Sequence, residues 1–440
     1  MARRSNAQTL SVFLNSRLVG NLKRAASGAI TFSYDEAWLA LPGSMPVSIS
    51  LPLTGEDFRG ASVINVFENL LPDAEQVRRN VAERLGAAGT DAFSLLSVAG
   101  RDCVGALHFL PEGETPGLAG EVTGDDLTET EIAAIVRKLR VSPLGMERED
   151  QEFRISIAGA QDKTALLRTG GRWQRPTGTT ATTHILKPAI GGLHNGFDLA
   201  DSVQNEFLCL KLCAAFGLEV AEASIERFDD QIVLSVTRFD RLWTDDGRLL
   251  RLPQEDFCQA FSVPSTLKYQ RDGGPGVLAI LERLKESDLP IEDRKNFLKA
   301  QMVFWLLGAT DGHAKNFSIA HRPGGGFRLT PLYDVLSAQP LADAGTLRRN
   351  RFKMAMSLGA NNHYRLDEIQ ARHFRETADA AGMPVGTVEE ICQELEKTVP
   401  SALDQIASNA GNIIPAALIE SLTNGVKSRQ TILGLNGSRL

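Results

Sequence analysis

Hydrophobic and polar positions alternate along the first part of the chain, which predicts a small β-sheet there. Residues 10–14 and 17–22 have the composition of two strands around a short turn, and residues 30–34 alternate in the same way. Residues 73–85 predict a helix, and residues 104–110 form a further apolar run that predicts a strand. The pattern therefore predicts an α+β unit over about the first 110 residues.

Strand-like runs continue in the middle of the chain. Residues 164–168 precede the turn signal Gly170-Gly171, as in a hairpin, and residues 183–187 and 232–236 predict two more strands. Between these two strands, residues 202–216 form an amphipathic pattern that predicts a helix.

Helices dominate the last third of the chain. From about residue 290 onward the pattern is helical, apart from one hairpin predicted over residues 317–320 and 327–329. The order of elements predicts an α+β protein with a sheet-rich lobe and a helix-rich lobe, and a cleft between lobes is a common place for a ligand.

The composition is that of an ordinary globular protein without an excess of positive charge. Of the 440 residues, 43% are hydrophobic and 23% are charged, and the formal net charge is −7 with a pI near 5.7. An acidic chain is not built to coat a polyphosphate, so any nucleic-acid contact must be local or made through a partner. The first residues do not have the pattern expected of a secretory signal, and the apolar run 302–307 is far shorter than the ~18 residues of a membrane-spanning helix. We expect no membrane association.

The five cysteines are scattered along the chain and odd in number, which indicates a reducing compartment and a cytoplasmic protein. Cys209 and Cys213 lie one helical turn apart and could in principle offer two thiolates to a metal ion. No second Cys/His pair at zinc-like spacing lies nearby, so we expect both side chains to be small buried hydrophobic groups.

Residues 308–318 (GATDGHAKNFS) carry the clearest chemical pattern. They follow an apolar helix and precede a hairpin, which predicts a loop on a rigid base. Phosphoryl transfer from a magnesium nucleotide needs a carboxylate that accepts the proton of the attacking hydroxyl, and oxygen ligands for Mg²⁺. Asp311, Asn316 and, after the hairpin, Asp334 supply these groups in the order that protein kinases use. The alternative is a capped turn followed by an ordinary surface acid.

Two upstream segments are candidates for phosphate contacts. Lys187 lies at the end of a predicted strand, and residues 156–164 (SIAGAQDKT) form a turn of small residues whose amides could approach phosphates closely. The turn lacks the Gly-Lys pair of a Walker motif. Taken alone, it could be an ordinary turn and Lys187 a solvated lysine.

Several long motifs resemble those of the HipA family of bacterial serine/threonine kinase toxins. The resemblance covers nearly the whole chain. Its segments are 69–73 (NLLPD), 100–105 (GRDCVG), 154–166 (RISIAGAQDKTAL), 182–187 (TTHILK), 238–241 (RFDR), 252–256 (LPQED), 308–316 (GATDGHAKN) and 330–334 (TPLYD).

The resemblance implies a two-lobed, protein-kinase-like α+β fold that uses ATP and Mg²⁺. The implied regions are an N-terminal subdomain (1–112), a linker and helix (113–149), the nucleotide-binding part of the N-lobe (150–260) and a helical C-terminal lobe (261–440).

The resemblance also implies roles for individual residues. Asp311 would be the catalytic base, Asn316 and Asp334 would hold Mg²⁺, and Ser156 would be the autophosphorylation site. The remaining residues implied at the nucleotide are Ala158, Gly159, Ala160, Gln161, Asp162 and Lys163 in a loop over the phosphates, Lys187 on the phosphates, Thr237, Arg238 and Phe239 at the hinge beside adenine, and His313, Ala314, Lys315 and Tyr333 lining the site. Phosphorylation of Ser156 would add about −1.5 to −2 charges, which predicts expulsion of the loop and loss of nucleotide binding.

Members of this family phosphorylate an aminoacyl-tRNA synthetase, glutamyl-tRNA synthetase in the best-known case, and so cause growth arrest and persistence. The resemblance therefore implies such a substrate, and a HipB-like helix-turn-helix antitoxin as partner. Operator DNA would be contacted mainly through the antitoxin, which agrees with the acidic pI.

The sequence departs from the family pattern at two places. Thr237 stands where the best-known member has an acid, which changes little if backbone groups bind adenine. After Arg375 the basic residues linked to operator contact are missing, and Asp379 would repel phosphate, so direct DNA contact is not expected.

Two competing functions remain open from the sequence. One is a co-repressor binding module whose kinase residues are vestigial, although the base, both metal ligands, the phosphate lysine and the loop serine are all present. The other is a small-molecule or lipid kinase, because the Asp-Gly-His-x-x-Asn pattern is loosely similar to lipid-kinase loops.

Overall fold

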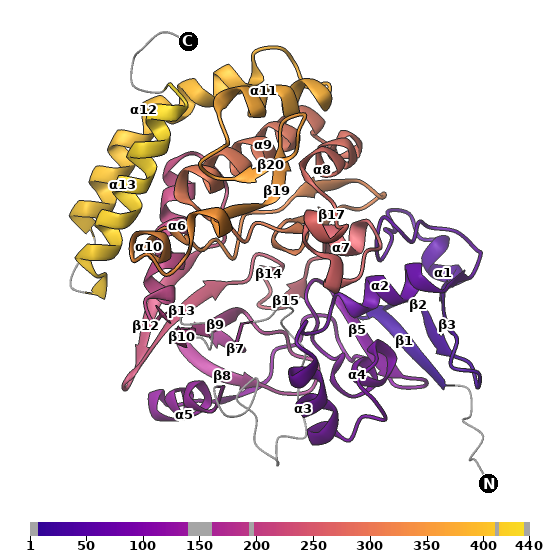
Figure 1. Ribbon diagram of the computed structural model, residues 1–440. Coiled ribbons are helices and arrows are strands. Elements are labelled where there is room, and N and C mark those ends of the chain that lie inside the picture. Colours follow the sequence, from indigo (N-terminus) through magenta and orange to yellow (C-terminus); the bar gives the residue numbers. More distant parts are fainter. Residues whose placement is uncertain (1–7, 140–160, 193–197, 410–412, 435–440) are drawn as a thin grey trace. The chain divides into compact units, whose positions relative to one another are not determined.

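The computed structural model describes residues 8–139, 161–192, 198–409 and 413–434, and its fold is α+β, as predicted (Figure 1). The chain divides into two compact units, each built from non-contiguous segments. The first unit comprises 1–188, 226–266 and 319–327, and the second comprises 189–225, 267–318 and 328–440.

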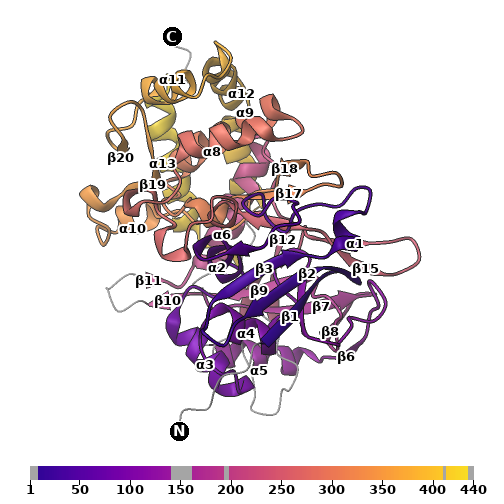
Figure 2. The same cartoon turned by 90° about the vertical axis from the view of Figure 1, so that its right-hand side faces the viewer.

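The N-terminal part of the first unit is a five-stranded sheet in the order β4-β3-β2-β1-β5, with antiparallel neighbours. Its strands are β1 (Gln8–Leu14), β2 (Arg17–Arg24), β3 (Ile30–Tyr34), β4 (Phe58–Arg59) and β5 (Leu107–Pro111). Its helices are α1 (Glu36–Leu39), α2 (Ala61–Glu68), α3 (Glu75–Leu85) and α4 (Ala92–Ala99). In Figure 2, β1, β2 and β3 lie side by side, as their pairing requires.

The predicted hairpin, third strand and helix of this part are confirmed, and one strand begins later than expected. Alternate side chains of the hairpin, such as Leu10 and Val12, enter an apolar core with Phe32. The strand predicted from residue 104 begins at Leu107, because Gly105 has a positive φ of 73° and donates its backbone N–H to a buried carboxylate.

A second sheet has the order β12-β13-β9-β7-β8-β6. Its strands are β6 (Gly124–Asp126), β7 (Thr164–Thr169), β8 (Arg172–Pro176), β9 (His184–Pro188), β12 (Ala223–Phe228), whose first residues belong to the second unit, and β13 (Gln231–Thr237). Helix α5 (Glu129–Leu139) packs Ile132 and Val136 against Leu166 and Leu186 of the sheet. The strands predicted around Gly170-Gly171, at 183–187 and at 232–236 are confirmed.

Shorter elements complete the first unit or carry the chain between the units. They are β14 (Arg241–Trp243), β15 (Leu249–Arg251), β16 (Gln254–Asp256), α7 (Phe257–Ala260), the 3-10 helix η2 (Ser265–Leu267), β17 (Ser318–His321) and β18 (Phe327–Leu329). β17 and β18 are the hairpin predicted at 317–329.

The second unit is mainly helical. Its helices are α6 (Ser202–Ala215), α8 (Val277–Arg283), α9 (Pro290–Leu307), α10 (Gln339–Asp343), α11 (Ala371–Ala380), α12 (Thr387–Asn409) and α13 (Ala416–Ile432), with the 3-10 turns η3 (Gln270–Asp272), η4 (Leu284–Glu286), η5 (Ala314–Asn316) and η6 (Arg349–Arg351). Its strands are β10 (Gly191–Gly192), β11 (Asp198–Leu199), β19 (Lys353–Leu358) and β20 (His363–Arg365). Figure 1 shows α12 and α13 running side by side.

Helix α9 is the buried centre of this unit and carries the loop that follows it. Its sequence starts with Pro290, whose missing N–H costs nothing in a first turn, and it ends at Gly308 in the left-handed conformation. Phe297, Phe304 and Trp305 on this helix are at most 1% exposed. The helix is therefore a rigid base for residues 308–318, as the sequence predicts.

No helix among the described residues is long and apolar enough to span a membrane. All five cysteines are buried free thiols. Cys209 and Cys213 are fully buried in α6, and burial raises the pKa of both thiols, so they pack as hydrophobic groups rather than offering thiolates to a metal.

Candidate active site

The loop between α9 and β17 is pressed onto the helix that precedes it. Gly308 has a φ of +68°, and a Cβ there would meet Cζ of Phe352 at 2.8 Å. A Cβ on Gly312 would meet the ring of Phe304 at 2.6 Å. Only glycine fits these two positions without displacing an aromatic side chain, so the glycines fix the course of the loop on each side of Asp311.

Asp311 presents its carboxylate to solvent, and both its side chain and its backbone accept a hydrogen bond. The hydroxyl of Tyr269 donates a hydrogen bond to Oδ1 of Asp311 at 2.5 Å. The side-chain amide Nδ2 of Asn316 donates to the Asp311 backbone carbonyl at 2.7 Å. The Asp311 side chain is 59% exposed. A fixed, solvent-facing carboxylate is suited to accept a proton from a second molecule.

His313 lies behind this carboxylate and is uncharged near neutral pH. Its Nε2 atom is 3.9 Å from Oδ2 of Asp311, and its ring packs edge-on against Tyr269. Burial lowers the pKa of His313, the carboxylates of Asp311 and Asp334 act in the opposite direction, and Lys268 lowers it further. The carboxylates of Asp311 and Asp334 thus both act on the His313 imidazole.

Asp334 is tied to the same loop through its neighbour Tyr333. The Tyr333 hydroxyl donates to the Lys315 carbonyl at 2.9 Å and lies 2.5 Å from Oγ of Ser318. Asp334 itself has a φ of +59°, a conformation that few residues other than glycine adopt. Such backbone conformations persist where the surroundings impose them and are concentrated at functional sites.

The donor groups on this loop fit a magnesium ion held together with phosphate oxygens. Because Nδ2 of Asn316 donates to a carbonyl, the orientation of the amide leaves Oδ1 as the atom for a metal. Asn316 and Asp334 would be two oxygen ligands, which is the number that Mg²⁺ commonly takes from a protein when phosphates complete its shell. The described residues contain no group of three or more His, Cys, Asp or Glu side chains that could hold a metal ion.

Within the first unit, two buried lysines lie at the same end of the β7–β9 strand pair. Thr164 of β7 pairs with Leu186 of β9; Lys163 directly precedes the former and Lys187 directly follows the latter. Both lysines are only 6% exposed. Two ammonium groups at neighbouring positions of a sheet require anionic or polar partners, which is compatible with a phosphate site.

The predicted hinge lies at the other end of β9, where the neighbouring strand β13 ends. Thr237, the last residue of β13, pairs with His184 at the start of β9, and Leu234 pairs with Lys187. Three residues of extended chain, about 10 Å, therefore separate the hinge from the lysine. Gln161, near Lys163, donates to the carbonyl of Pro188, at the lysine end.

The described residues do not include Ser156, Ala158, Gly159 and Ala160, so the predictions for these four lie outside the structure. Gln161, Asp162 and Lys163 are the described part of the predicted phosphate loop, and Asp162 is exposed. Phe239, the last of the three hinge residues, is half-buried.

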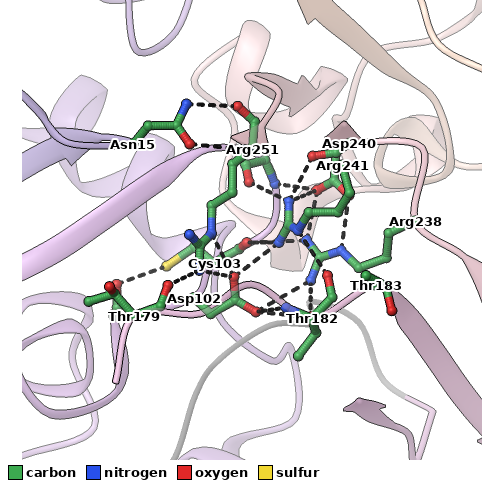
Figure 3. A network of polar contacts seen from close by, with 12 residues as sticks. Asn15, Asp102, Cys103, Thr179, Thr182, Thr183, Arg238, Asp240, Arg241 and Arg251 are labelled. Atoms are coloured by element: carbon green, nitrogen blue, oxygen red, sulfur yellow. Dashed lines mark hydrogen bonds and ion pairs between the residues drawn. The ribbon is translucent and has the colours of Figure 1, made fainter. Parts of the chain in front are cut away.

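Arg238, predicted at the adenine hinge, turns its side chain away into a buried ionic network (Figure 3). Its guanidinium donates to both carboxylate oxygens of Asp240, at 2.9 and 2.7 Å, and to the hydroxyl of Thr182. The backbone N–H of Arg238 also donates, to the carbonyl of Thr183 at 2.9 Å.

The network contains three arginines and two aspartates. Asp102 contacts Arg241 at 3.1 Å and Arg251 at 2.7 Å, and Asp240 contacts Arg241 at 3.0 Å. All of these side chains are at most 4% exposed. Burial and the neighbouring Arg238 charge lower the pKa of Arg241 to about 9, although both carboxylates oppose this. The network joins two of the motifs that carried the family resemblance, 100–105 and 238–241, within one unit.

Tyr269 is the site residue that the sequence analysis did not identify. It belongs to a polar stretch before η3 and lies 42 positions from Asp311. The sequence offered one signal for Tyr269. The chain has only four tyrosines, and Tyr269 is followed closely by the glycine-rich run 273–276. The contact itself depends on the tertiary fold.

Comparison with known proteins identifies the family to which the chain belongs. The family model described as the HipA-like C-terminal domain matches residues 155–403, and the model described as the HipA N-terminal domain matches residues 10–110. "Putative kinase Y4mE" of Sinorhizobium fredii is 34% identical over 98% of this chain and 99% of its own length. "Serine/threonine-protein kinase toxin HipA" of Shewanella oneidensis is 27% identical over 90% of this chain and 89% of its own.

A solved structure has the same fold over the full chain. It is described as the Shewanella oneidensis toxin–antitoxin system HipA, HipB and its operator DNA complex, and it matches with a TM-score of 0.79 at 23% identity, covering 98% of this chain and 100% of that chain. The fold and the family models define an α+β protein kinase of the serine/threonine class. The chain belongs to the HipA family of kinase toxins, which confirms the resemblance seen in the sequence.

Proposed function

We propose that the chain is the toxin of a toxin–antitoxin pair and transfers the γ-phosphate of ATP, with Mg²⁺, to a serine or threonine of a translation factor in the cytoplasm. An aminoacyl-tRNA synthetase is the proposed substrate, with glutamyl-tRNA synthetase the first to test, and growth arrest with persistence is the proposed outcome. The observation that carries the proposal is Asp311, whose carboxylate accepts a hydrogen bond from Tyr269 and whose backbone carbonyl accepts one from Asn316, with the carboxylates of Asp311 and Asp334 both acting on His313.

In this proposal Asp311 takes the proton of the substrate hydroxyl as the hydroxyl oxygen attacks phosphorus. Oδ1 accepts the Tyr269 hydroxyl, so Oδ2 is the oxygen that receives the proton. Asn316 and Asp334 would hold Mg²⁺, which would neutralise charge on the phosphates. Lys163 and Lys187 are proposed as phosphate ligands, and the backbone of Thr237, Arg238 and Phe239 as the adenine contact.

A HipB-like helix-turn-helix antitoxin is the proposed partner, and operator DNA would be bound mainly by it. Support comes from helix α11. Its Arg375 is paired with Glu389 at 2.5 Å, and Asp379 is exposed on the same helix. A paired arginine and an exposed carboxylate do not favour binding to a phosphate backbone.

Replacement of the proposed base tests the enzymatic function. Asp311→Gln keeps the size of an exposed side chain within one methylene but cannot accept the proton, so we expect phosphate transfer to fall by about 10²–10⁴-fold and growth arrest to disappear. The measurement is phosphoproteomics after brief expression, together with transfer to purified glutamyl-tRNA synthetase. Asp404→Asn, a comparable loss of charge on exposed α12, is the control and should keep full activity.

Undiminished phosphorylation by the Asp311→Gln variant would disprove the role of Asp311 as the base.

Mg-ATP should also raise the melting temperature of the wild type, because a ligand that binds only the native state stabilises it. If saturating Mg-ATP leaves the melting temperature unchanged, the co-repressor function is favoured instead.

Self-silencing through Ser156 has a separate test. We expect Ser156→Ala to transfer phosphate but to escape silencing, because it cannot acquire the phosphate charge beside the ATP loop. ATP affinity is to be measured for autophosphorylated wild type and for Ser156→Ala after incubation with ATP. Equal affinities would refute the proposed silencing.

A further inference from the structure

Tyr269 belongs to a short and tightly turned stretch of the second unit, residues 268–276 (KYQRDGGPG), which we call the tyrosine segment. The Tyr269 carbonyl accepts hydrogen bonds from the backbone N–H groups of Asp272 and Gly274, both at 3.0 Å. A Cβ on Gly274 would lie 2.0 Å from the Leu267 carbonyl oxygen, so the turn closes in this form only with glycine there. The backbone that follows Tyr269 is therefore fixed by the segment itself.

The first residues of the tyrosine segment are anchored on the loop that carries Asp311. The backbone N–H of Ala314 donates to the Lys268 carbonyl at 3.2 Å. The Tyr269 hydroxyl donates to Oδ1 of Asp311, and the Tyr269 ring lies edge-on against His313 with the ring centres 5.0 Å apart. The segment and the loop are thus joined through the backbone just before Tyr269 and through its side chain.

The side chain of Gln270 anchors the residue after Tyr269 on strand β19. Its Oε1 atom accepts a hydrogen bond from the backbone N–H of Ser357 at 2.8 Å, and its Nε2 atom donates to the Ser357 hydroxyl at 2.7 Å. Ser357 is 6% exposed, and its hydroxyl donates in turn to Oδ1 of Asn362 at 2.9 Å. Because one amide makes both hydrogen bonds to one buried residue, its position and its orientation are both defined.

Gly276 leaves the space that the Gln270 amide occupies. A Cβ on Gly276 would lie 2.2 Å from Cδ and Oε1 of Gln270 and 2.7 Å from its Nε2 atom. The backbone of Gly276 is extended, with a φ of −103°, a conformation that any residue adopts. Glycine is therefore needed at this position for the Gln270 side chain and not for the backbone.

Strand β19 is a firm attachment for Gln270. All of its residues after Lys353 are buried. The turn that follows the strand is held by helix α11, because the backbone N–H of Gly359 donates to Oγ1 of the buried Thr377 at 2.8 Å. Tyr269 thus lies between two anchored neighbours, Lys268 on the loop and Gln270 on a packed strand.

We propose that Gln270 is a positioning residue for phosphate transfer, which acts through the Tyr269 hydroxyl on the Asp311 carboxylate. The proposal rests on the proposed kinase function and adds to it a residue that reaches Asp311 only through its neighbour. With Gln270 on Ser357, the Tyr269 hydroxyl meets Oδ1 of Asp311 and leaves Oδ2 for the proton of the substrate. A displacement of about 1 Å at a reacting group can cost about 10²-fold in rate, so a small drift of Tyr269 is enough to slow the reaction.

Phosphate transfer by two variants of the full-length protein tests the proposal. Gln270→Ala removes the amide, and Gly276→Ala keeps it but adds a Cβ that pushes it off Ser357. Transfer from labelled ATP is followed on two acceptors, purified glutamyl-tRNA synthetase and the serines of the chain itself. We expect both variants to lower the rate constant at saturating ATP by about 5–50-fold and to change the KM for ATP by less than about twofold, because neither residue is proposed to bind the nucleotide. Wild-type rates in both variants would overturn the inference and leave the kinase function supported.

Gln259→Ala is the matched control. The Gln259 amide also makes two hydrogen bonds, since it accepts from the backbone N–H of Asp256 and donates to the Val66 carbonyl, both at 3.1 Å, but it belongs to the first unit. We expect Gln259→Ala and Gln270→Ala to lower the melting temperature by comparable amounts, whereas the rate constant should stay within about twofold of the wild type only in Gln259→Ala. An equal loss of rate in the two variants would show that Gln270 matters only for stability, and would overturn the inference.

A double substitution tests the route through Tyr269. If Gln270 acts through the Tyr269 hydroxyl, Gln270→Ala has little left to disturb once this hydroxyl is gone. We therefore expect Tyr269→Phe/Gln270→Ala to be within about twofold of Tyr269→Phe alone, because substitutions that share one interaction are not additive. Losses that multiply in the double variant would contradict this route.

The NMR signal of the His313 ring gives a readout that does not require phosphate transfer. Because this ring lies edge-on against Tyr269, a displaced tyrosine changes the shielding of the imidazole protons. With histidine-labelled protein, and the signal assigned by its loss in His313→Asn, we expect a shift in Gln270→Ala and Gly276→Ala but none in Gln259→Ala. An unchanged His313 signal in Gln270→Ala would contradict the inference. If the wild type transfers phosphate to neither acceptor, the kinase function is contradicted, and the His313 signal alone decides whether Gln270 positions Tyr269.

Discussion

Tyr269 donates a hydrogen bond to Oδ1 of the Asp311 carboxylate. Oδ2 is then the oxygen that we propose to accept the proton of the substrate hydroxyl. A hydrogen bond to a carboxylate contributes roughly 1.5–3 kcal/mol, enough to keep the group in one orientation. Tyr269 also packs its ring on His313, so the hydroxyl is itself fixed. We regard Tyr269 as a positioning residue for the proposed base.

We expect Tyr269→Phe to lower kcat by about 10–100-fold while changing the KM for ATP little, because the ring contact stays and only the hydrogen bond is lost. Tyr364→Phe, the same chemical change on β20, should have no effect. Steady-state kinetics of both variants decide the matter. A rise in KM with unchanged kcat in Tyr269→Phe would assign the hydroxyl to ground-state binding instead.

Individual residues also show where sequence reasoning reaches its limit. The spacing of Asp311 and Asn316 lies within one loop, so a local pattern was sufficient to single them out. Arg238 was placed at the hinge by resemblance, but no local pattern shows that its side chain enters the network, because the Cys103 carbonyl to which it donates lies 135 positions away.

At the scale of elements, the end of α9 sets the position of the proposed catalytic loop, residues 308–318. The helix stops at Gly308 because only a residue without a side chain both adopts the left-handed conformation cheaply and leaves room for Phe352. A pattern of apolar positions predicts such a helix and its terminal glycine. It does not predict which aromatic ring occupies the space beside that glycine.

We expect Gly308→Ala to destabilise the protein by about 2–4 kcal/mol, the sum of left-handed strain and a displaced Phe352 ring. Gly382→Ala is the matched control, because Gly382 follows α11 with a similar φ of +63° and nothing within 4 Å of a Cβ. It should cost only the strain, about 1–2 kcal/mol. Urea unfolding measures both, and equal losses would show that the Phe352 contact does not matter.

At the scale of the whole chain, the ionic network connects parts of the sequence that local patterns cannot relate. Arg241 and Asp102 are 139 positions apart, yet their side chains are 3.1 Å apart. The strands, the hairpins and the catalytic loop followed from periodicity and turn residues over short windows. The network, like the contact between Tyr269 and Asp311, arises only when the chain is folded, although the resemblance had already singled out its motifs.

We expect Asp102→Asn to lower the free energy of unfolding by about 3–5 kcal/mol, because three buried guanidinium groups are then left with one carboxylate. Asp126→Asn, which breaks the exposed pair with Arg172, is the control and should leave the unfolding midpoint unchanged. Chemical denaturation at pH 7 compares the two. A midpoint for Asp102→Asn within error of the control would contradict the importance of the network.

Asp240, the other carboxylate of the network, stabilises the fold in a way that depends on pH. Burial opposes its ionisation, but Arg238 and Arg241 outweigh burial and lower the pKa of Asp240 below its ordinary 3.8. A carboxylate with a lowered pKa stabilises the fold fully above its unfolded-state pKa and loses this effect as pH falls through the folded value. The stability that the Asp240 carboxylate contributes should therefore be the same at pH 5 and pH 7, which the cost of Asp240→Asn at the two pH values measures.

The division of each unit into separate stretches of sequence has a consequence for synthesis on the ribosome. The first unit includes residues 319–327, and the second extends to the last helix. Neither can be completed while its later segments are still inside the exit tunnel, so a nascent chain gains its phosphotransfer centre only near the end of translation. For the toxin that we propose, truncated translation products would then be harmless to the cell that makes them.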